Sequence, residues 1–265
     1  MLVFMLSIQL CIAQQPNSWS RSELGLHVGQ MYYIGEINPY IPFNESNNAF
    51  GLMYRLNKHS RMSYRLNYTY GSLSGYDAKS NFAQNVNRNL SFQTSIHELS
   101  AGIELHFKMF QMGNKRYPET FYFILEGGIF RMNPKTNYGG QMLTLRELGT
   151  EGQLGRKRYN LYQLCIPIGI GYKFNIGSFG TFNIDIAIRK TFTDYIDDVG
   201  AANYASQEDF YNHTDPDLSY ALSNQSLDGS ATERRGNPAT KDWYVYAGAT
   251  LAFKLGSGNI CWDFK

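Results

Sequence analysis

The sequence has little of what several common classes of protein need. Its 265 residues carry a formal net charge of only +2, so no basic surface is expected to bind the phosphate backbone of a nucleic acid. No apolar run reaches the roughly 18 residues of a transmembrane helix, and helical periodicity is nearly absent. The sequence therefore excludes a nucleic-acid-binding protein and a helical membrane protein.

The first residues, MLVFMLSIQLCIAQQ, predict a signal peptide over residues 1–13. Leu2 to Ala13 form an apolar stretch of suitable length, and Ala13 before Gln14 suits cleavage, although the usual positive leader is missing. Cys11 raises the alternative of a lipoprotein, but Leu10 stands where a lipobox needs a small residue. We therefore expect an exported protein in which residues 14–265 form a single domain.

What the sequence has in quantity is aromatic residues, 15% of the chain, and strict alternation of apolar with small, polar or charged residues. Alternation with a period of two residues predicts strands, and aromatic rings at strand ends suit a membrane interface. The rings placed there include Tyr32, Tyr54, Tyr64, Phe107 and Phe121. Eight segments alternate in this way: 22–35, 49–57, 62–73, 92–107, 120–130, 159–174, 180–193 and 242–255.

Eight amphipathic strands fit either a soluble barrel with the apolar face inside or a membrane barrel with the apolar face outside. The connections after the second, fourth and sixth segments are short, whereas the others are long, the last spanning 194–241. Sorting of short turns and long loops to opposite rims is typical of outer-membrane barrels. We therefore predict an all-β fold, an eight-stranded antiparallel transmembrane β-barrel with long extracellular loops and short periplasmic turns. Both termini, including a tail at 256–265, would be periplasmic.

The inward-facing parity of these strands carries charges of both signs. An eight-stranded barrel is just wide enough to be filled by side chains, and an unpaired buried charge is costly. We expect the charges to pair across the lumen as a polar plug, with a polar conduit or a proton relay as the alternative. The residues of this predicted network are Glu23, Arg55, Arg65, Glu98, Glu104, Glu126, Asp185 and Arg189.

Three acids follow the seventh segment, in the stretch RKTFTDYIDDVGAANY. Asp194, Asp197 and Asp198 supply the hard oxygen ligands that calcium prefers, with Asp215 and Asp217 further along, but their spacing matches no familiar calcium loop. A structural motif at the outer rim is the favoured interpretation. We expect Asp197 and Asp198 to cap a short helix or to accept bonds from loop backbone, with the long loop folded over the barrel mouth.

Signals for catalysis are poor. The five histidines show no metal-ligand spacing, and no serine lies in a nucleophile motif. A barrel enzyme would have to use a pair such as His97 with Glu98, or His213 with Asp215, at the outer rim. We therefore predict no enzymatic activity and no catalytic, cofactor-binding or metal site.

Two cysteines remain after removal of the signal peptide. Cys165 lies on the inward parity of the sixth segment, and Cys261 lies in the tail GSGNICWDFK. We expect these two to be too far apart for a disulfide. Cys261 is therefore a free thiol or pairs with another protein. With Trp262 and Phe264 it makes the tail a candidate docking peptide, the alternative being a disordered end.

Three stretches resemble the conserved blocks of the PorG family, a small outer-membrane β-barrel of the type IX secretion system in Bacteroidetes. They are GLHVGQMYYIGEINP (25–39), RKTFTDYIDDVGAANY (189–204) and RRGNPATKDWYVYAGATLAFKL (234–255). The resemblance runs from the first strand to the last and includes the cysteine of the tail, although CWDF stands where the family's tail motif begins with Cys-Pro.

The resemblance implies a role that the residues alone do not indicate. Members of this family are outer-membrane anchors for a periplasmic ring built of the PorK lipoprotein and PorN, and they do not form the translocation pore. The implied partners are these ring proteins and outer-membrane lipid, with no nucleic acid, small-molecule substrate or cofactor. A different small barrel, acting as an adhesin or a porin-like protein, is the alternative function.

Overall fold

The computed structural model describes residues 22–38, 42–43, 45–154, 158–230 and 234–255. The predicted signal peptide and the predicted tail, with Cys261, Trp262 and Phe264, lie outside these ranges.

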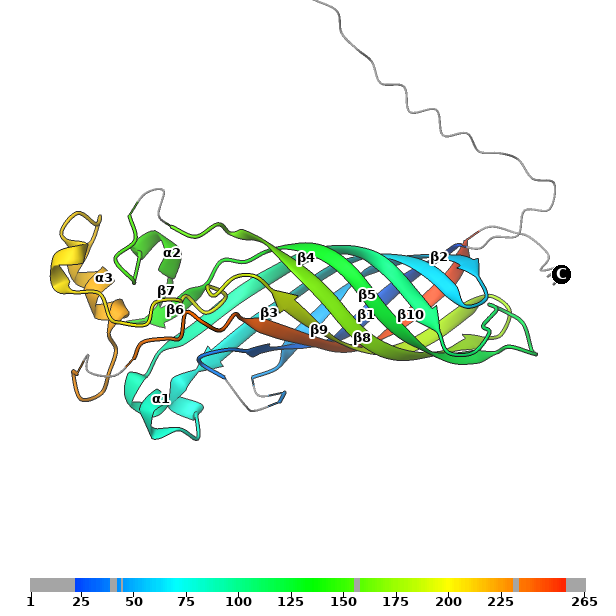
Figure 1. The fold of residues 1–265 in the computed structure, drawn as a ribbon, viewed down its shortest axis with the longest axis horizontal. Coiled ribbons are helices and arrows are strands. Elements are labelled where there is room, and N and C mark those ends of the chain that lie inside the picture. Colours follow the sequence, from blue (N-terminus) through cyan, green and yellow to red (C-terminus); the bar gives the residue numbers. More distant parts are fainter. Residues whose placement is uncertain (1–21, 39–41, 44, 155–157, 231–233, 256–265) are drawn as a thin grey trace, which may run out of the picture.

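Within the described ranges, eight antiparallel strands close into a barrel, which confirms the predicted fold (Figure 1). Each strand pairs with its neighbours along the chain, and β1 closes the barrel against β10, from Ser22 opposite Leu255 to Ile34 opposite Trp243. The predicted segments match the observed strands to within about three residues at each end. These strands are β1 (Ser22–Ile34), β2 (Asn47–His59), β3 (Met62–Tyr76), β4 (Ser91–His106), β5 (Glu119–Arg131), β8 (Tyr162–Ile176), β9 (Gly180–Thr191) and β10 (Trp243–Leu255).

The apolar parity of the strands faces outward and the charged parity faces the lumen. On β1, Val28 is 64% exposed whereas Glu23 is 0% exposed, and the other barrel strands repeat this alternation. Exposed apolar side chains would be unfavourable in water but are well placed in hydrocarbon. A closed sheet leaves no backbone edge without a hydrogen-bond partner there. The barrel therefore has the construction of a membrane-spanning one rather than of a soluble one.

Aromatic rings gather near the short-turn end of the barrel wall. Tyr54, Tyr64, Phe107 and Phe121 are all exposed there, as expected for an interfacial girdle. Tyr32 differs from the prediction, because it is only 7% exposed and its ring packs against Phe43 in the loop after β1, at a centroid distance of 4.8 Å.

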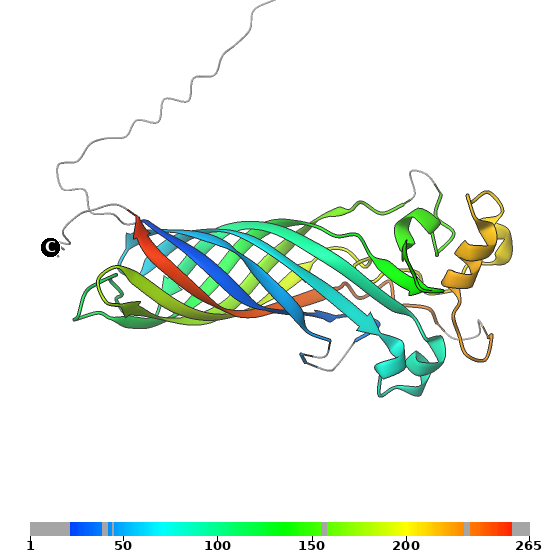
Figure 2. The ribbon, with the colours of Figure 1, turned by 180° about the vertical axis from the view of Figure 1, so that it is seen from behind.

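The long loops carry short elements of their own, and both views place these elements at one end of the barrel, opposite the end with the short turns (Figures 1 and 2). We call this assembly of loops the cap. Among the described residues, no helix is long and apolar enough to cross a bilayer. The cap elements are η1 (Asp77–Lys79), α1 (Ala83–Arg88), β6 (Lys135–Tyr138), β7 (Gln141–Thr144), α2 (Leu145–Leu148), η3 (Gln207–Phe210) and α3 (Pro216–Ser223).

A hydrophobic core lies at the junction of barrel and cap. Tyr33 of β1 packs edge-on against Phe92 of β4, with ring centroids 4.8 Å apart, and Ile196 and Val199 of the loop after β9 belong to the same buried cluster. The outer end of the lumen is thus filled with apolar side chains contributed by strands and loops together. The cap therefore contacts the barrel through a shared hydrophobic core and is not joined to it by the chain alone.

Candidate functional site

Arg55 is the centre of the lumen network near the short turns. Its guanidinium lies 2.9 Å from Glu23 and 2.8 Å from Glu104, and all three side chains are fully buried. Lys173, a buried residue of β8, adds a contact of 2.7 Å to Glu104. Each partner comes from a different strand, so these ion pairs join four walls of the barrel across its axis.

The network continues along the axis to the cap. Arg65 lies 3.2 Å from both Glu104 and Glu126 and 3.4 Å from Asp185. Nearer the cap, Arg189 pairs with Glu98 at 3.2 Å. The structure therefore places all eight predicted lumen residues inside the barrel and within ion-pair distance of an opposite charge.

These side chains leave little free space in the lumen. A cavity there, lined by His27, Arg65 and Asp185 among others, has a volume of about 10 Å³, which is room for about one water molecule. Passage of a solute along this part of the lumen would require several of these buried ion pairs to break. The polar plug, rather than the conduit, is the arrangement that the structure shows.

At the barrel mouth, one tyrosine hydroxyl joins two acids of the cap. Tyr33 Oη lies 2.6 Å from Asp197 Oδ2 and 2.7 Å from Asp242 Oδ1. A hydroxyl has only one proton to donate, so one of the two carboxyl groups must itself be protonated to complete the pair of bonds. Burial, with the neighbouring Asp242 charge, raises the pKa of Asp197 well above its usual range, and burial with the Glu36 charge does the same for Asp242.

Asp198 links two long loops. Its carboxylate accepts hydrogen bonds from Tyr159, at 2.6 Å, and from Thr150, and Arg235, which is paired with Glu151, lies close by. Burial raises the pKa of Asp198 to about 6. The backbone of Asp198 is left-handed, with φ of 66°, a conformation that aspartate adopts more readily than most residues.

The role predicted for the acids after β9 holds only in part. Asp197 accepts a bond from the loop backbone at Val199, 2.9 Å away, but neither it nor Asp198 caps a helix. The N-cap residue of helix α3 is Asp215, whose Oδ1 accepts a hydrogen bond from Leu218 N at 3.2 Å. Asp198 instead bonds to the side-chain hydroxyls of Thr150 and Tyr159 in another loop, because the two loops fold onto each other.

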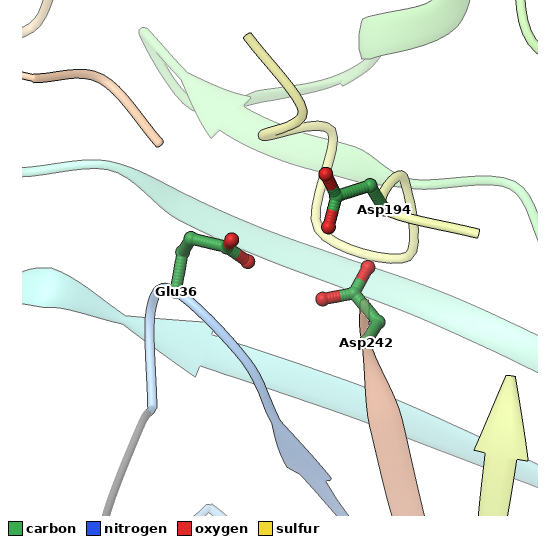
Figure 3. A group of neighbouring side chains, drawn as sticks. All are labelled: Glu36, Asp194 and Asp242. Atoms are coloured by element: carbon green, nitrogen blue, oxygen red, sulfur yellow. The ribbon is translucent and has the colours of Figure 1, made fainter. Parts of the chain in front are cut away.

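Asp194, the third acid, joins a different cluster (Figure 3). Its carboxylate, that of Glu36 after β1 and that of Asp242 before β10 each offer an oxygen, and these atoms lie within 4.8 Å of one another. Lys241 Nζ lies 3.4 Å from Asp194 Oδ2. Three carboxylates at this separation are suited to a hard cation such as calcium, so this is the part of the described structure that could hold a metal.

The residue pairs considered for catalysis are not assembled. His97 faces outward, where its Nδ1 lies 3.0 Å from the Tyr68 hydroxyl, while Glu98 faces the lumen. His213 Nε2 lies 3.1 Å from the carbonyl oxygen of Gln153, and Asp215 caps α3. Neither histidine therefore has the carboxylate partner that general acid–base chemistry would use.

Several residues of the mouth were missed by the sequence analysis. Tyr33, Glu36 and Asp242 complete the acid clusters, and Arg235 ties the loop before β10 to Glu151. A signal was present, since all four lie within two of the three quoted stretches, 25–39 and 234–255. Cys165 is buried as predicted from its parity, with Sγ 3.8 Å from the Tyr244 hydroxyl.

Comparison with known proteins gives a family and several distant structures. The model of a family described as "Domain of unknown function (DUF6089)" matches residues 1–222. No curated protein matches the sequence.

Solved structures similar to this chain include three barrels. Neisserial surface protein A (NspA) has 9% identity and a TM-score of 0.40, covering 89% of this chain and 98% of its own. The N-terminal β-barrel domain of Pseudomonas aeruginosa OprF has 11% identity and a TM-score of 0.35, covering 87% and 97%. Ail, the attachment invasion locus protein of Yersinia pestis, has 12% identity and a TM-score of 0.39, covering 88% and 97%.

Proposed function

Since the chain belongs to the DUF6089 family, whose description assigns no activity, we propose its function from its own geometry and motifs. It is a non-enzymatic barrel of the bacterial outer membrane, with both termini in the periplasm. It serves the type IX secretion machinery by anchoring or positioning the periplasmic ring of PorK and PorN. The role is mechanical, because the barrel offers a rigid membrane anchor and no path for cargo.

The filled lumen is the observation that carries this proposal. Arg55, Arg65 and Arg189 each hold acids from other strands across the axis. A buried pair loses several kcal/mol when one partner is removed, so opening a channel would require breaking several such pairs at once. A sealed barrel suits an anchor and not a porin.

The convergence of the three quoted stretches gives further support. Tyr33 from 25–39, Asp197 from 189–204 and Asp242 from 234–255 meet in one pair of hydrogen bonds at the mouth. The residues on which the PorG resemblance rests are therefore a single structural unit and not three unrelated similarities. This unit ties the first, seventh and last barrel strands together beneath the cap.

Affinity purification from outer membranes tests the proposal. A tagged, full-length chain extracted in mild detergent is expected to bring down the PorK-type lipoprotein and the PorN-type subunit in comparable amounts. A second preparation carrying W262A and F264A tests the tail as the docking segment and is expected to recover much less of both proteins. The C261S variant, run on a non-reducing gel, shows whether a disulfide contributes.

The controls separate a failed anchor from a failed fold. Each variant barrel must remain heat-modifiable on a gel, which reports an intact sheet. If folded wild-type barrel recovers no periplasmic ring protein, the anchor role is wrong. Appreciable conductance in planar bilayers would instead favour a porin-like protein.

A second candidate function is recognition at the cell surface. The cap carries exposed apolar side chains, including Tyr211, Leu227 and Phe82, which could contact a partner at the cell surface. An adhesin would use this surface. Binding of the purified barrel to host cells, lost on replacing Tyr211 and Leu227 with serine, would support it over the anchor.

A further inference from the structure

The acids at the barrel mouth outnumber the cations that face them. Glu36, Asp194, Asp197 and Asp242 lie together, and Lys241 contacts the group through a single distance of 3.4 Å to Asp194. The nearby guanidinium of Arg88 is engaged by Asp77 at 2.7 Å, and that of Arg235 by Glu151. A partly buried group of like charges is costly unless protons or a cation balance it.

Asp194 has a buried carboxylate oxygen that no described group contacts. The residue is 3% exposed, and among the residues that the structure describes its Oδ1 has no hydrogen-bond partner. Buried carboxylate oxygens without a donor are rare and call for an explanation such as an ion. Figure 3 shows the carboxylate of Asp194 converging with those of Glu36 and Asp242 from three separate segments.

We propose that Glu36, Asp194 and Asp242 bind one calcium ion at the mouth of the barrel. Their oxygens, within 4.8 Å of one another, have the separation expected of ligands around a single cation whose bonds are about 2.4 Å long. Calcium accepts six to eight oxygen ligands in flexible geometry, so backbone carbonyls and water complete the shell.

The other acid of the group, Asp197, is engaged by the protein itself. Its Oδ2 lies 2.6 Å from the Tyr33 hydroxyl, and its Oδ1 accepts from Val199 N at 2.9 Å. Asp242 Oδ1 lies 2.7 Å from the same hydroxyl, and its Oδ2 accepts from Ile196 N at 2.8 Å. Because a carboxylate offers about four lone pairs, Asp242 still has one free for a cation.

The site is accessible from outside the barrel. Glu36 is half-buried and lines a cavity of about 480 Å³ in the cap, together with Arg88, Gly236 and Asn237. Through this cavity an ion can reach Glu36, which is the one of the three proposed ligands that lines it. A bound ion would join three segments: the loop after β1, the loop after β9 and the residue directly before β10. It would therefore stabilise the folded cap.

Calcium titration of the purified, chelator-treated barrel in detergent tests the site. At pH 7.5, isothermal titration with CaCl₂ is expected to show one site, with weaker binding of MgCl₂, which demands a smaller octahedral shell. The D194N variant removes one ligand charge while keeping the shape, and it is expected to bind at least about tenfold more weakly because calcium affinity follows ligand charge. The E36Q variant gives a second, independent measurement at a half-buried position.

The matched control is D217N, an exposed acid of α3 in the same long loop, which should bind calcium as wild type does. Protease cleavage within 192–242 should slow on adding calcium in wild type and in D217N, but not in D194N. If the wild-type barrel takes up no calcium and its cleavage does not change, the cluster holds only protons and Lys241 and the inference is wrong. If D217N and D194N lost calcium affinity equally, the binding site would lie elsewhere. The calcium result does not depend on recovery of ring proteins, so the two proposals fail separately.

Discussion

Tyr33 and Asp197, which lie 164 positions apart in the chain, are joined by a hydrogen bond of 2.6 Å at the mouth of the barrel. Tyr33 lies near the end of β1 and Asp197 lies in the loop after β9, and both are buried. This bond therefore helps to fix the cap to the barrel. Its removal should loosen the cap and leave the barrel closed.

Replacing Tyr33 with phenylalanine should destabilise the cap selectively. The change leaves two buried carboxyl groups without their shared hydroxyl, at a cost of about 1–3 kcal/mol. Cleavage of the loop 192–242 by trypsin should become faster, while the heat-modifiable mobility of the barrel stays unchanged. The Y172F variant removes an exposed hydroxyl that bonds to Glu119 at 2.5 Å near the short turns, and it should leave the rate unaltered. Unchanged cleavage in Y33F would show that the hydroxyl does not hold the cap.

Replacing Arg55 with methionine should weaken the barrel itself. The change leaves Glu23 and Glu104 buried without their main cation, and breaking a buried pair in this way typically costs about 3–5 kcal/mol. The transition to the unfolded band on a heating series should move to a lower temperature. Lys115→Met, in the exposed turn after β4, is the control. A transition temperature equal to wild type in R55M would mean that the lumen pairs do not contribute to barrel stability.

Adding one methyl group at Gly29 should also destabilise the barrel. A Cβ there would lie 2.3 Å from the carbonyl oxygen of Ala247 and 2.6 Å from the Cα of Gly248, so backbone has to move. Overpacking of this kind costs about 1–3 kcal/mol. The G127A variant places its methyl group in open space on the outer wall and should behave as wild type. The yield of refolding into detergent micelles is measured for both variants. Equal yields for G29A and G127A would contradict the predicted steric overlap at Gly29.

The cap should be more stable at pH 5 than at pH 8. Burial raises the pKa of Asp198 to about 6 and, with the Glu36 charge, that of Asp194 to about 6 as well. A raised carboxyl pKa means that the folded cap binds the proton more tightly than the unfolded loop does. This contribution is complete below about pH 4 and is lost as pH rises through about 6. For Asp198 alone it is on the order of 3 kcal/mol.

Hydrogen exchange of the loop 192–242 at several pH values measures this dependence, with the exchange rates corrected for their own dependence on pH. The D198N variant keeps an oxygen acceptor and a residue type that tolerates the left-handed backbone, and its profile should be flatter between pH 4 and 6. If hydrogen exchange in the wild-type cap became slower with rising pH in the absence of calcium, the stabilising role of these protonated carboxyl groups would be wrong. Calcium must be absent, because it would stabilise the ionised cluster at high pH.

The sequence by itself determined the barrel wall. Alternation along a strand is a local property with a period of two residues, so the parity of Val28 and Glu23 could be assigned without knowing the neighbours of β1. The count of alternating segments then predicted eight strands, and the difference in length between the two sets of connections predicted which rim carries the long loops.

Only the tertiary structure decided which groups meet. The pairing of Arg65 with Asp185, 120 positions away, depends on the stagger of the closed sheet, and several acids were equally available to the same guanidinium. The helices of the cap have at most eight residues, too few for helical periodicity to show. The cluster of Glu36, Asp194 and Asp242 forms where three chain segments cross the rim, and nothing in the local sequence of any one of them encodes the position of the other two.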